Sequence, residues 1–208
     1  MDARDVLTPL SWRDLAHRWW RVAVVVALLV AAVVWRLVKD DLGAPPNLEL
    51  ATAATFAGAL LLRNRAAAVA PLVVAVVSDL VLGNTSILVF TWSAWAVTGV
   101  AAVLLPRYSG RREGGRRLGW KRYATALGFG VGCSVWFFLW TNFGVWVVGD
   151  GSWYPRTVGG LVDCYVAGLP FARTMLVGNL VLVPLAAGLV TLVERLERAA
   201  QHGAVAAR

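Results

Sequence analysis

Eight polar and aromatic residues lie near the ends of apolar segments, and together their side chains could bind a small organic solute. Carboxylates and guanidinium groups attract opposite charges, an amide donates and accepts hydrogen bonds, and aromatic rings offer flat apolar surfaces. A charge at the centre of a membrane-spanning helix costs about 2.5–3.5 kcal/mol on insertion scales, so the positions of charged residues in apolar segments are informative: they indicate a polar cavity or a network that holds the helix ends together. Asp79 could pair with Arg156 or Arg173, which would lower the cost of its burial. The predicted wall of the site consists of Asp79, Asn142, Trp146, Tyr154, Arg156, Asp163, Tyr165 and Arg173.

Asn142 lies in the aromatic stretch WFFLWTNFGVWVVGDGSWYPRT, which runs from Trp136 to Thr157. A spacing of four places Phe138, Asn142 and Trp146 on one face of a helix, and this face favours the wall of a ligand site. The alternative is an asparagine that bonds to a neighbouring helix, worth about 0.6–2 kcal/mol, beside tryptophans of the membrane interface. At the level of sequence both interpretations stay open.

Motifs for common catalytic chemistries are absent from the sequence. It contains no GxxxxGK[ST], HExxH or GxSxG, so it has no phosphate-binding loop, zinc-protease helix or nucleophile elbow. Cys133 and Cys164 have no metal-ligand spacing, and we predict neither a metal nor a cofactor. We expect a protein that is not an enzyme, and a membrane enzyme using Asp79 or Asp163 is the weaker hypothesis.

These residues must be positioned by long apolar segments. Of the 208 residues, 59% are hydrophobic and 15% charged, and the apolar runs approach the roughly 20 residues that cross a bilayer as a helix. Pro170 is expected to end an interfacial element, because proline removes a hydrogen bond from a helix interior. The sequence predicts an all-α membrane protein, a single domain of about six transmembrane helices. The predicted helices are 19–38, 48–62, 66–82, 87–105, 123–148 and 171–193, with a short interfacial element at 158–169 and a basic cytoplasmic loop at 106–122.

Basic residues are distributed unequally between the two ends of the predicted helices. With the N-terminus inside, sixteen of the twenty Lys and Arg lie in inner segments, and three, Arg36, Lys39 and Arg156, in outer ones. The positive-inside rule therefore predicts that both termini are cytoplasmic. The basic residues flank apolar segments, so we expect contact with anionic membrane lipid and not with nucleic acid. The alternative for the first segment is a cleaved signal peptide.

Small residues recur at helical spacing on three of the predicted helices. Such faces let two helices approach closely, and we interpret them as packing positions. They are Ala23, Ala27 and Ala31, then Ala54 and Gly58, then Gly128 and Gly132.

The segments PNLELATAATFAGALLLRNR, APLVVAVVSDLVLG, TNFGVW and WYPRTVGGLVDCYVAGLPFARTMLVGNL resemble the pattern of a family of small, uncharacterised bacterial multi-helix membrane proteins. The resemblance covers most of residues 46–194 and implies the bacterial cytoplasmic membrane, with no activity to carry over. At a coarser level, the chain is similar to the S components of energy-coupling-factor (ECF) vitamin transporters. That similarity implies an organic solute and, as partner, a transmembrane scaffold with ATPases, docked on the alanine face of the first helix. The histidine-containing ligand set of the metal-binding members is absent.

Two functional hypotheses follow. The first is a polytopic membrane protein that binds a small organic solute at its outer face, as the substrate-binding subunit of an ATP-powered importer. The alternative is a non-catalytic membrane scaffold or assembly factor, in which the outer polar groups only tie helices together.

Overall fold

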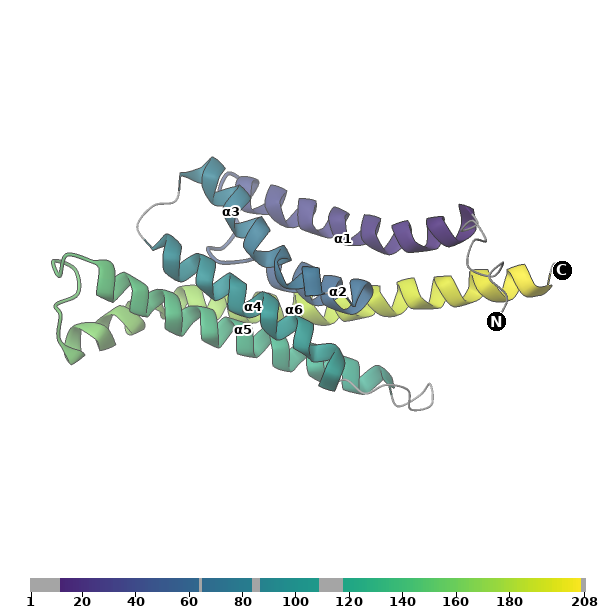
Figure 1. Ribbon diagram of the computed structural model, residues 1–208. Coiled ribbons are helices and arrows are strands. Elements are labelled where there is room, and N and C mark those ends of the chain that lie inside the picture. Colours follow the sequence, from purple (N-terminus) through teal and green to yellow (C-terminus); the bar gives the residue numbers. More distant parts are fainter. Residues whose placement is uncertain (1–11, 64, 84–86, 109–117, 207–208) are drawn as a thin grey trace, which may run out of the picture.

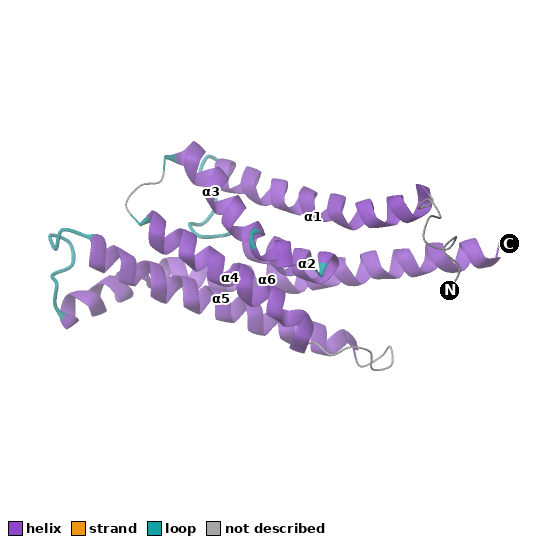
Figure 2. Ribbon diagram, in the orientation of Figure 1, coloured by secondary structure: helices purple, strands orange, loops and turns teal. Residues whose placement is uncertain are grey.

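The computed structural model is helical throughout the residues that it describes, with turns and irregular connections between the helices and no strand among those residues (Figure 2). It describes residues 12–63, 65–83, 87–108 and 118–206, and only the backbone of 12–18, 106–108, 118–119 and 201–206. The helices are α1 (Trp12–Val38), α2 (Ala51–Leu62), the 3-10 helix η2 (Arg65–Ala68), α3 (Ala70–Leu82), α4 (Leu88–Tyr108), α5 (Leu118–Val148) and α6 (Val158–Ala206).

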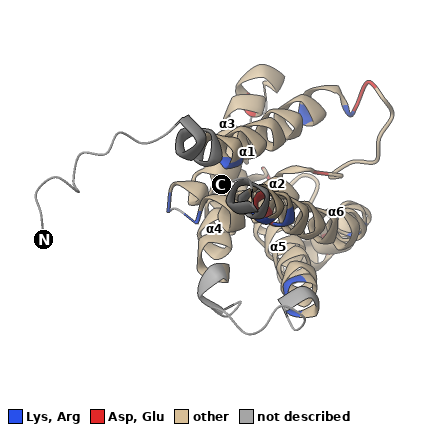
Figure 3. Cartoon of the chain, turned by 90° about the vertical axis from the view of Figure 1, so that its right-hand side faces the viewer, with Lys and Arg blue, Asp and Glu red and all other residues tan. Residues whose placement is uncertain are grey.

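The helices form an elongated bundle with two distinct ends (Figure 1). The connections 39–50 and 149–157 lie at one end, which we call the connection end. The start of α1 and the end of α6 lie at the other, the termini end. Helix α6 extends along the whole bundle, and its packing against α5 is the most extensive between any two helices. Seen from the termini end, the helices carry few charged residues (Figure 3).

Helix α2 occupies the centre of the bundle. It packs against α1, α3, α4, α5 and α6, and every residue from Ala51 to Ala59 is buried. A helix that is apolar and small on all sides is typical of such a position, because it has no face for solvent. Its partners include Val25 of α1 and Phe129 of α5, whose ring lies 5.6 Å from that of Phe56. This central helix determines where the surrounding helices can lie.

Among the residues that the structure describes, four helices are long and apolar enough to cross a membrane, namely α1, α4, α5 and α6. The other two expected crossings are shorter than a bilayer-spanning helix, since α2 has 12 residues and α3 has 13, about 18 and 20 Å. At the connection end, Glu49 just before α2 is ion-paired with Arg36. At the termini end, Arg21 binds both the Leu61 carbonyl of α2 and the Glu197 carboxylate. Fifteen residues of α1 separate these two arginines, about 22 Å of helix, which a short helix can cover.

Residues 158–206 form one helix, which corrects the expected division into an interfacial element and a separate sixth helix at Pro170. The helix continues because α5 supports its first half, where the Tyr165 hydroxyl donates to the Leu139 carbonyl at 3.0 Å. Beyond the proline, the Thr174 hydroxyl donates to the Pro170 carbonyl at 3.2 Å, the usual bond of a helical threonine to the residue four before it. Helix α5 also begins at Leu118, inside the expected basic loop. The part of that loop at 109–117 lies outside the described residues.

The glycines that allow close packing on α5 differ from those expected. No atom lies within 4 Å of the position that a Cβ would take at Gly128 or Gly132. At Gly130, by contrast, a Cβ would lie 3.0 Å from the Asn179 carbonyl oxygen of α6. The tightest approach is at Gly99 of α4, where a Cβ would overlap the backbone of Ala68 in η2.

We expect Gly99→Ala to lower the free energy of unfolding by at least about 1–3 kcal/mol, the usual cost of overpacking. The added methyl would collide with backbone that cannot rotate away. Gly128→Ala is the matched control, since its methyl meets nothing and alanine is the better helix former by about 1 kcal/mol. Thermal unfolding midpoints of both variants in one detergent check this, and equal midpoints would contradict the packing at Gly99.

Candidate functional site

Four charged side chains meet in a buried region at the connection end, and we call them the charge cluster: Arg36, Lys39, Glu49 and Asp79. The Arg36 guanidinium donates to Asp79 Oδ1 at 3.0 Å and lies 3.6 Å from Glu49 Oε1. Lys39 Nζ donates to the same Glu49 oxygen at 2.9 Å. The side chain of Asp79 is 1% exposed. Two positive and two negative charges therefore compensate one another almost out of contact with solvent.

Two helices and the 39–50 connection place these four groups. Arg36 lies in the last turn of α1, Glu49 just precedes α2, and Asp79 lies one turn before the end of α3. Two indole N–H groups complete the arrangement. Trp92 of α4 donates to Asp79 Oδ2 at 2.9 Å, and Trp35 donates to the Leu48 carbonyl at 2.7 Å. The cluster thus ties α1, the 39–50 connection, α3 and α4 to one another.

Some buried polar atoms in and near the charge cluster have no partner. Arg36 Nε, Glu49 Oε2, Thr52 Oγ1 and Trp95 Nε1 are buried without a hydrogen bond in the part of the chain that the structure describes. No side chain caps the start of α2, close to Glu49 and Thr52. Unpaired buried polar groups are costly, about 1–3 kcal/mol each. Charge pairing therefore has to offset the free-energy cost of these unpaired polar atoms.

The partner of Asp79 differs from the sequence expectation, because Arg36 occupies that role and neither Arg156 nor Arg173 does. From sequence, Arg36 and Lys39 enter only the charge count of the outer segments. The sequence does contain a signal for this pairing. Arg36 and Lys39, three residues apart, end one apolar segment, and the carboxylate of Asp79 lies near the end of another on the same predicted side of the membrane.

Asn142 and Tyr165 link α5 to α6. The Asn142 amide donates to the Phe138 carbonyl of its own helix at 2.8 Å, and its side chain lies against Gly168 of α6. The Tyr165 ring packs edge-on against Phe138, with ring centres 5.6 Å apart. Cys164 donates its thiol to the Asn142 carbonyl. The Asn142 amide therefore bonds within α5, and its side chain meets α6 through packing at Gly168.

The 149–157 connection is held by its own hydrogen bonds. Trp146 Nε1 donates to the Pro155 carbonyl at 3.0 Å, and Arg156 donates to the Gly149 carbonyl at 2.7 Å. The hydroxyl and the backbone N–H of Ser152 both donate to Asp150, and they hold the pKa of that carboxyl below its ordinary value. Of the remaining predicted wall residues, Tyr154 is half-buried and Asp163 is exposed.

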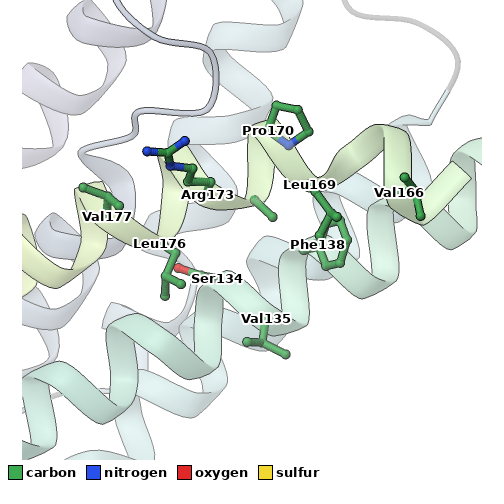
Figure 4. Close-up of a pocket in the computed structure, with 10 residues that line it drawn as sticks. Ser134, Val135, Phe138, Val166, Leu169, Pro170, Arg173, Leu176 and Val177 are labelled. Carbon is green, nitrogen blue, oxygen red and sulfur yellow. The ribbon is translucent and has the colours of Figure 1, made fainter.

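A groove of about 600 Å³ lies between α5 and α6 (Figure 4). Such a volume falls within the range of small-molecule sites. Nine of its ten lining residues are uncharged, and Arg173 is the exception. In Figure 4, Arg173 extends from the side of α6 that faces away from Val135. The lining residues are Ser134, Val135, Phe138, Val166, Leu169, Pro170, Ala172, Arg173, Leu176 and Val177.

Arg173 is exposed and forms no ion pair or hydrogen bond within the described ranges. Its level in the bundle follows from Leu48 of the 39–50 connection, which packs against Gly178. Arg173 is five residues nearer the connection end, about 7.5 Å along α6. It therefore lies close to the level at which the 39–50 connection crosses the bundle, and its positive charge is available to an anion.

Of the eight predicted wall residues, the structure brings Asn142 and Tyr165 near one another and places Arg173 alone on the groove. Asp79 belongs to the charge cluster, and Trp146 and Arg156 serve the 149–157 connection. Among the described residues, no three His, Cys, Asp or Glu side chains are grouped closely enough to hold a metal ion. The arrangement can neutralise an anion at Arg173 and cover an apolar group in the groove.

Comparison with known proteins yields one family. The profile of a family of unknown function, DUF6580, matches residues 16–201, which is most of the chain. No curated protein and no solved structure matches significantly.

We expect Arg36→Met to lower the free energy of unfolding by about 3–5 kcal/mol, because it leaves two buried carboxylates with a single cation. The double variant Arg36→Met, Asp79→Leu restores neutrality, so it should be more stable than Arg36→Met alone. Unfolding midpoints in detergent provide the measurement. Asp163→Asn, which changes an exposed carboxylate at the same end, is the control. If the change in unfolding free energy of the double variant equals the sum of the changes for Arg36→Met and Asp79→Leu alone, the two charges do not compensate one another.

Proposed function

The chain belongs to this family of unknown function, and we propose that it binds a small organic anion in the groove between α5 and α6. The observation that carries the proposal is Arg173, the one charged residue of the groove lining. A charge inside a membrane helix faces a partner, a cavity or the interface. Because no carboxylate of the described residues pairs with Arg173, a bound anion is the partner that its position suits best. The outer face is the connection end in this proposal, with both termini cytoplasmic.

The proposal differs in location from the polar wall expected from sequence. Most members of that wall bond to the protein itself, as Trp146 does to Pro155 and Tyr165 to Leu139. A solute would compete with these bonds only at a cost of about 0.5–1.5 kcal/mol for each. Binding in the groove would break no such hydrogen bond, because a hydrocarbon or ring surface is enough to cover its apolar side chains.

The alternative, a non-catalytic scaffold or assembly factor, is favoured by the same internal bonds. Tyr165 and the charge cluster tie helices together, as that hypothesis requires. Arg173 separates the two functions, because a scaffold has no need of an unpaired cation beside an apolar groove.

We expect the purified wild-type protein to retain a small anion in native mass spectrometry, and Arg173→Ala to lose it. The control is Arg156→Ala, which removes an exposed arginine of the same end that bonds to Gly149; this variant should keep the anion. Identical spectra for wild type and Arg173→Ala would count against the binding proposal and in favour of the scaffold.

The binding proposal extends to transport, with the protein as the substrate-binding subunit of an ATP-powered importer. The sequence contains no phosphate-binding loop, so a partner would have to supply ATP hydrolysis. Ala23, Ala27 and Ala31 are exposed on α1, as docking onto a scaffold requires. This role is the one shared with S components of ECF transporters.

We expect Ala27→Trp to abolish uptake of the bound anion in cells without loss of binding to the purified protein, because the large ring would block close helix contact. The control is Val100→Trp on α4, which is also an exposed position. Val177 of α6 is exposed as well, but it lines the groove and is therefore not a suitable control. Equal uptake by Ala27→Trp and wild type would remove α1 as a docking face.

A further inference from the structure

Three buried polar atoms in and beside the charge cluster form no hydrogen bond within the described part of the chain, namely Arg36 Nε, Glu49 Oε2 and Thr52 Oγ1. Thr52 is completely buried, and Glu49 is 7% exposed. Arg36 meets Glu49 through another nitrogen of its guanidinium, which lies 3.6 Å from Oε1 of the carboxylate. The ion pair therefore leaves one donor and one charged acceptor unused on two side chains that already touch.

Thr52 lies next to Glu49, in the first turn of α2. Leu50, which precedes the helix, has helical torsion angles of φ −85° and ψ −16°, so the Cα atoms of Glu49 and Thr52 are close to one helical turn apart. The side chains of a helix lean toward its N-terminus. The Thr52 hydroxyl is therefore directed toward the end of α2 that Glu49 adjoins.

The start of α2 contributes further donors. Its first turn is closed by the hydrogen bond from the Ala54 N–H to the Leu50 carbonyl at 2.9 Å. The backbone N–H groups of Ala51, Thr52 and Ala53 come before this bond, so they have no acceptor within the helix, and no side chain caps them. All three residues are buried, which keeps bulk solvent away from these groups.

The chemistry of these groups selects what can bind among them. The charge cluster holds two cations and two carboxylates, so either an anion or a cation would add an uncompensated charge to a buried region. An anion would also meet Glu49, and a cation would meet Arg36 and the positive end of α2. Water carries no net charge, donates to carboxylate oxygens, accepts from N–H groups and needs about 2–4 polar partners.

We propose that an ordered water molecule is bound at the start of α2, where it donates to Glu49 Oε2, accepts from Arg36 Nε or a first-turn N–H, and bonds to the Thr52 hydroxyl. This site goes beyond the anion binding proposed above, since it involves neither Arg173 nor the groove. The buried charge cluster thereby has a solvent ligand of its own, which satisfies the polar atoms that ion pairing leaves over.

The wild-type protein tests the site without any substitution. The full chain, labelled with carbon-13 threonine and placed in lipid bilayers, is measured by water-edited solid-state NMR, in which signal passes from water to nearby carbons. Thr98 of α4 is the matched control, because it is similarly buried and its hydroxyl donates to the Ala94 carbonyl of its own helix. We expect the Thr52 signal to build up severalfold faster than that of Thr98. Equally slow build-up would overturn the proposal.

The variant Thr52→Val provides a second test, in which the sign of the effect decides. Valine keeps the shape of threonine and has a similar helix propensity, but it lacks the hydroxyl. With water bound, the change removes one of its partners, and we expect the unfolding midpoint in detergent to fall. Without water, removal of an unsatisfied buried hydroxyl would raise the midpoint. Thr55→Val is the control and should change little, because the Thr55 hydroxyl bonds only to the Ala51 carbonyl of its own helix.

Two outcomes with these variants would overturn the water site. The first is a midpoint of Thr52→Val at or above that of the wild type. The second is a midpoint that NaCl raises in the wild type and not in Thr52→Val, because a bound ion stabilises the folded state in proportion to its concentration, and the start of α2 would then bind an ion. Neither outcome depends on Arg173, so the anion site is judged separately by its own variants.

Discussion

Charge compensation at the connection end is the constraint on which the arrangement of the first four helices depends. Asp79 and Glu49 can be buried only because Arg36 and Lys39 are buried with them, at 3.0 and 2.9 Å for the two shortest pairs. Isolated ions in such surroundings carry a penalty of several kcal/mol each. The end of α1 must therefore stay beside α3 and the start of α2, and Trp92 brings α4 to the same place. Displacement of any one of these elements would expose charge to hydrocarbon.

Small side chains provide the complementary constraint in the interior. Helix α2 can be surrounded by five helices because its buried residues are Ala, Gly and Thr apart from two large side chains, Phe56 and Leu61. A small residue has the same effect at Gly99 of α4, where the absence of a side chain lets η2 contact the helix backbone. Polar side chains inside this core bond locally, as Thr55 does to the Ala51 carbonyl. The result is a centre with little freedom.

The helical class and the positions of the apolar segments could be predicted from sequence, because segment length and composition alone determine them. Pairing could not. Arg36 and Asp79 are 43 residues apart, and a choice of Arg36 over the expected Arg156 or Arg173 requires the packing of α1 on α3. Pro170 was expected to end a helix, and it does not, since contacts with α5 hold both sides of it. Asn142 allowed two interpretations that differ only in what faces its amide, here Gly168 of α6. Arg173 was recognised as unusual, but the groove beside it depends on how α5 and α6 diverge.

The two levels of ion pairs, at Arg21 and Arg36, are separated by fifteen residues of α1, or about 22 Å. A typical bilayer has a hydrocarbon thickness of about 30 Å. Around α2 and α3 the lipid must therefore become thinner, or flanking basic side chains must snorkel to the interface, and each response costs a fraction of a kcal/mol per Å of mismatch. A protein with this profile deforms the membrane next to it and partitions toward thin bilayers. Hydrophobic mismatch thus becomes a property of the molecule, set by where its buried charges lie.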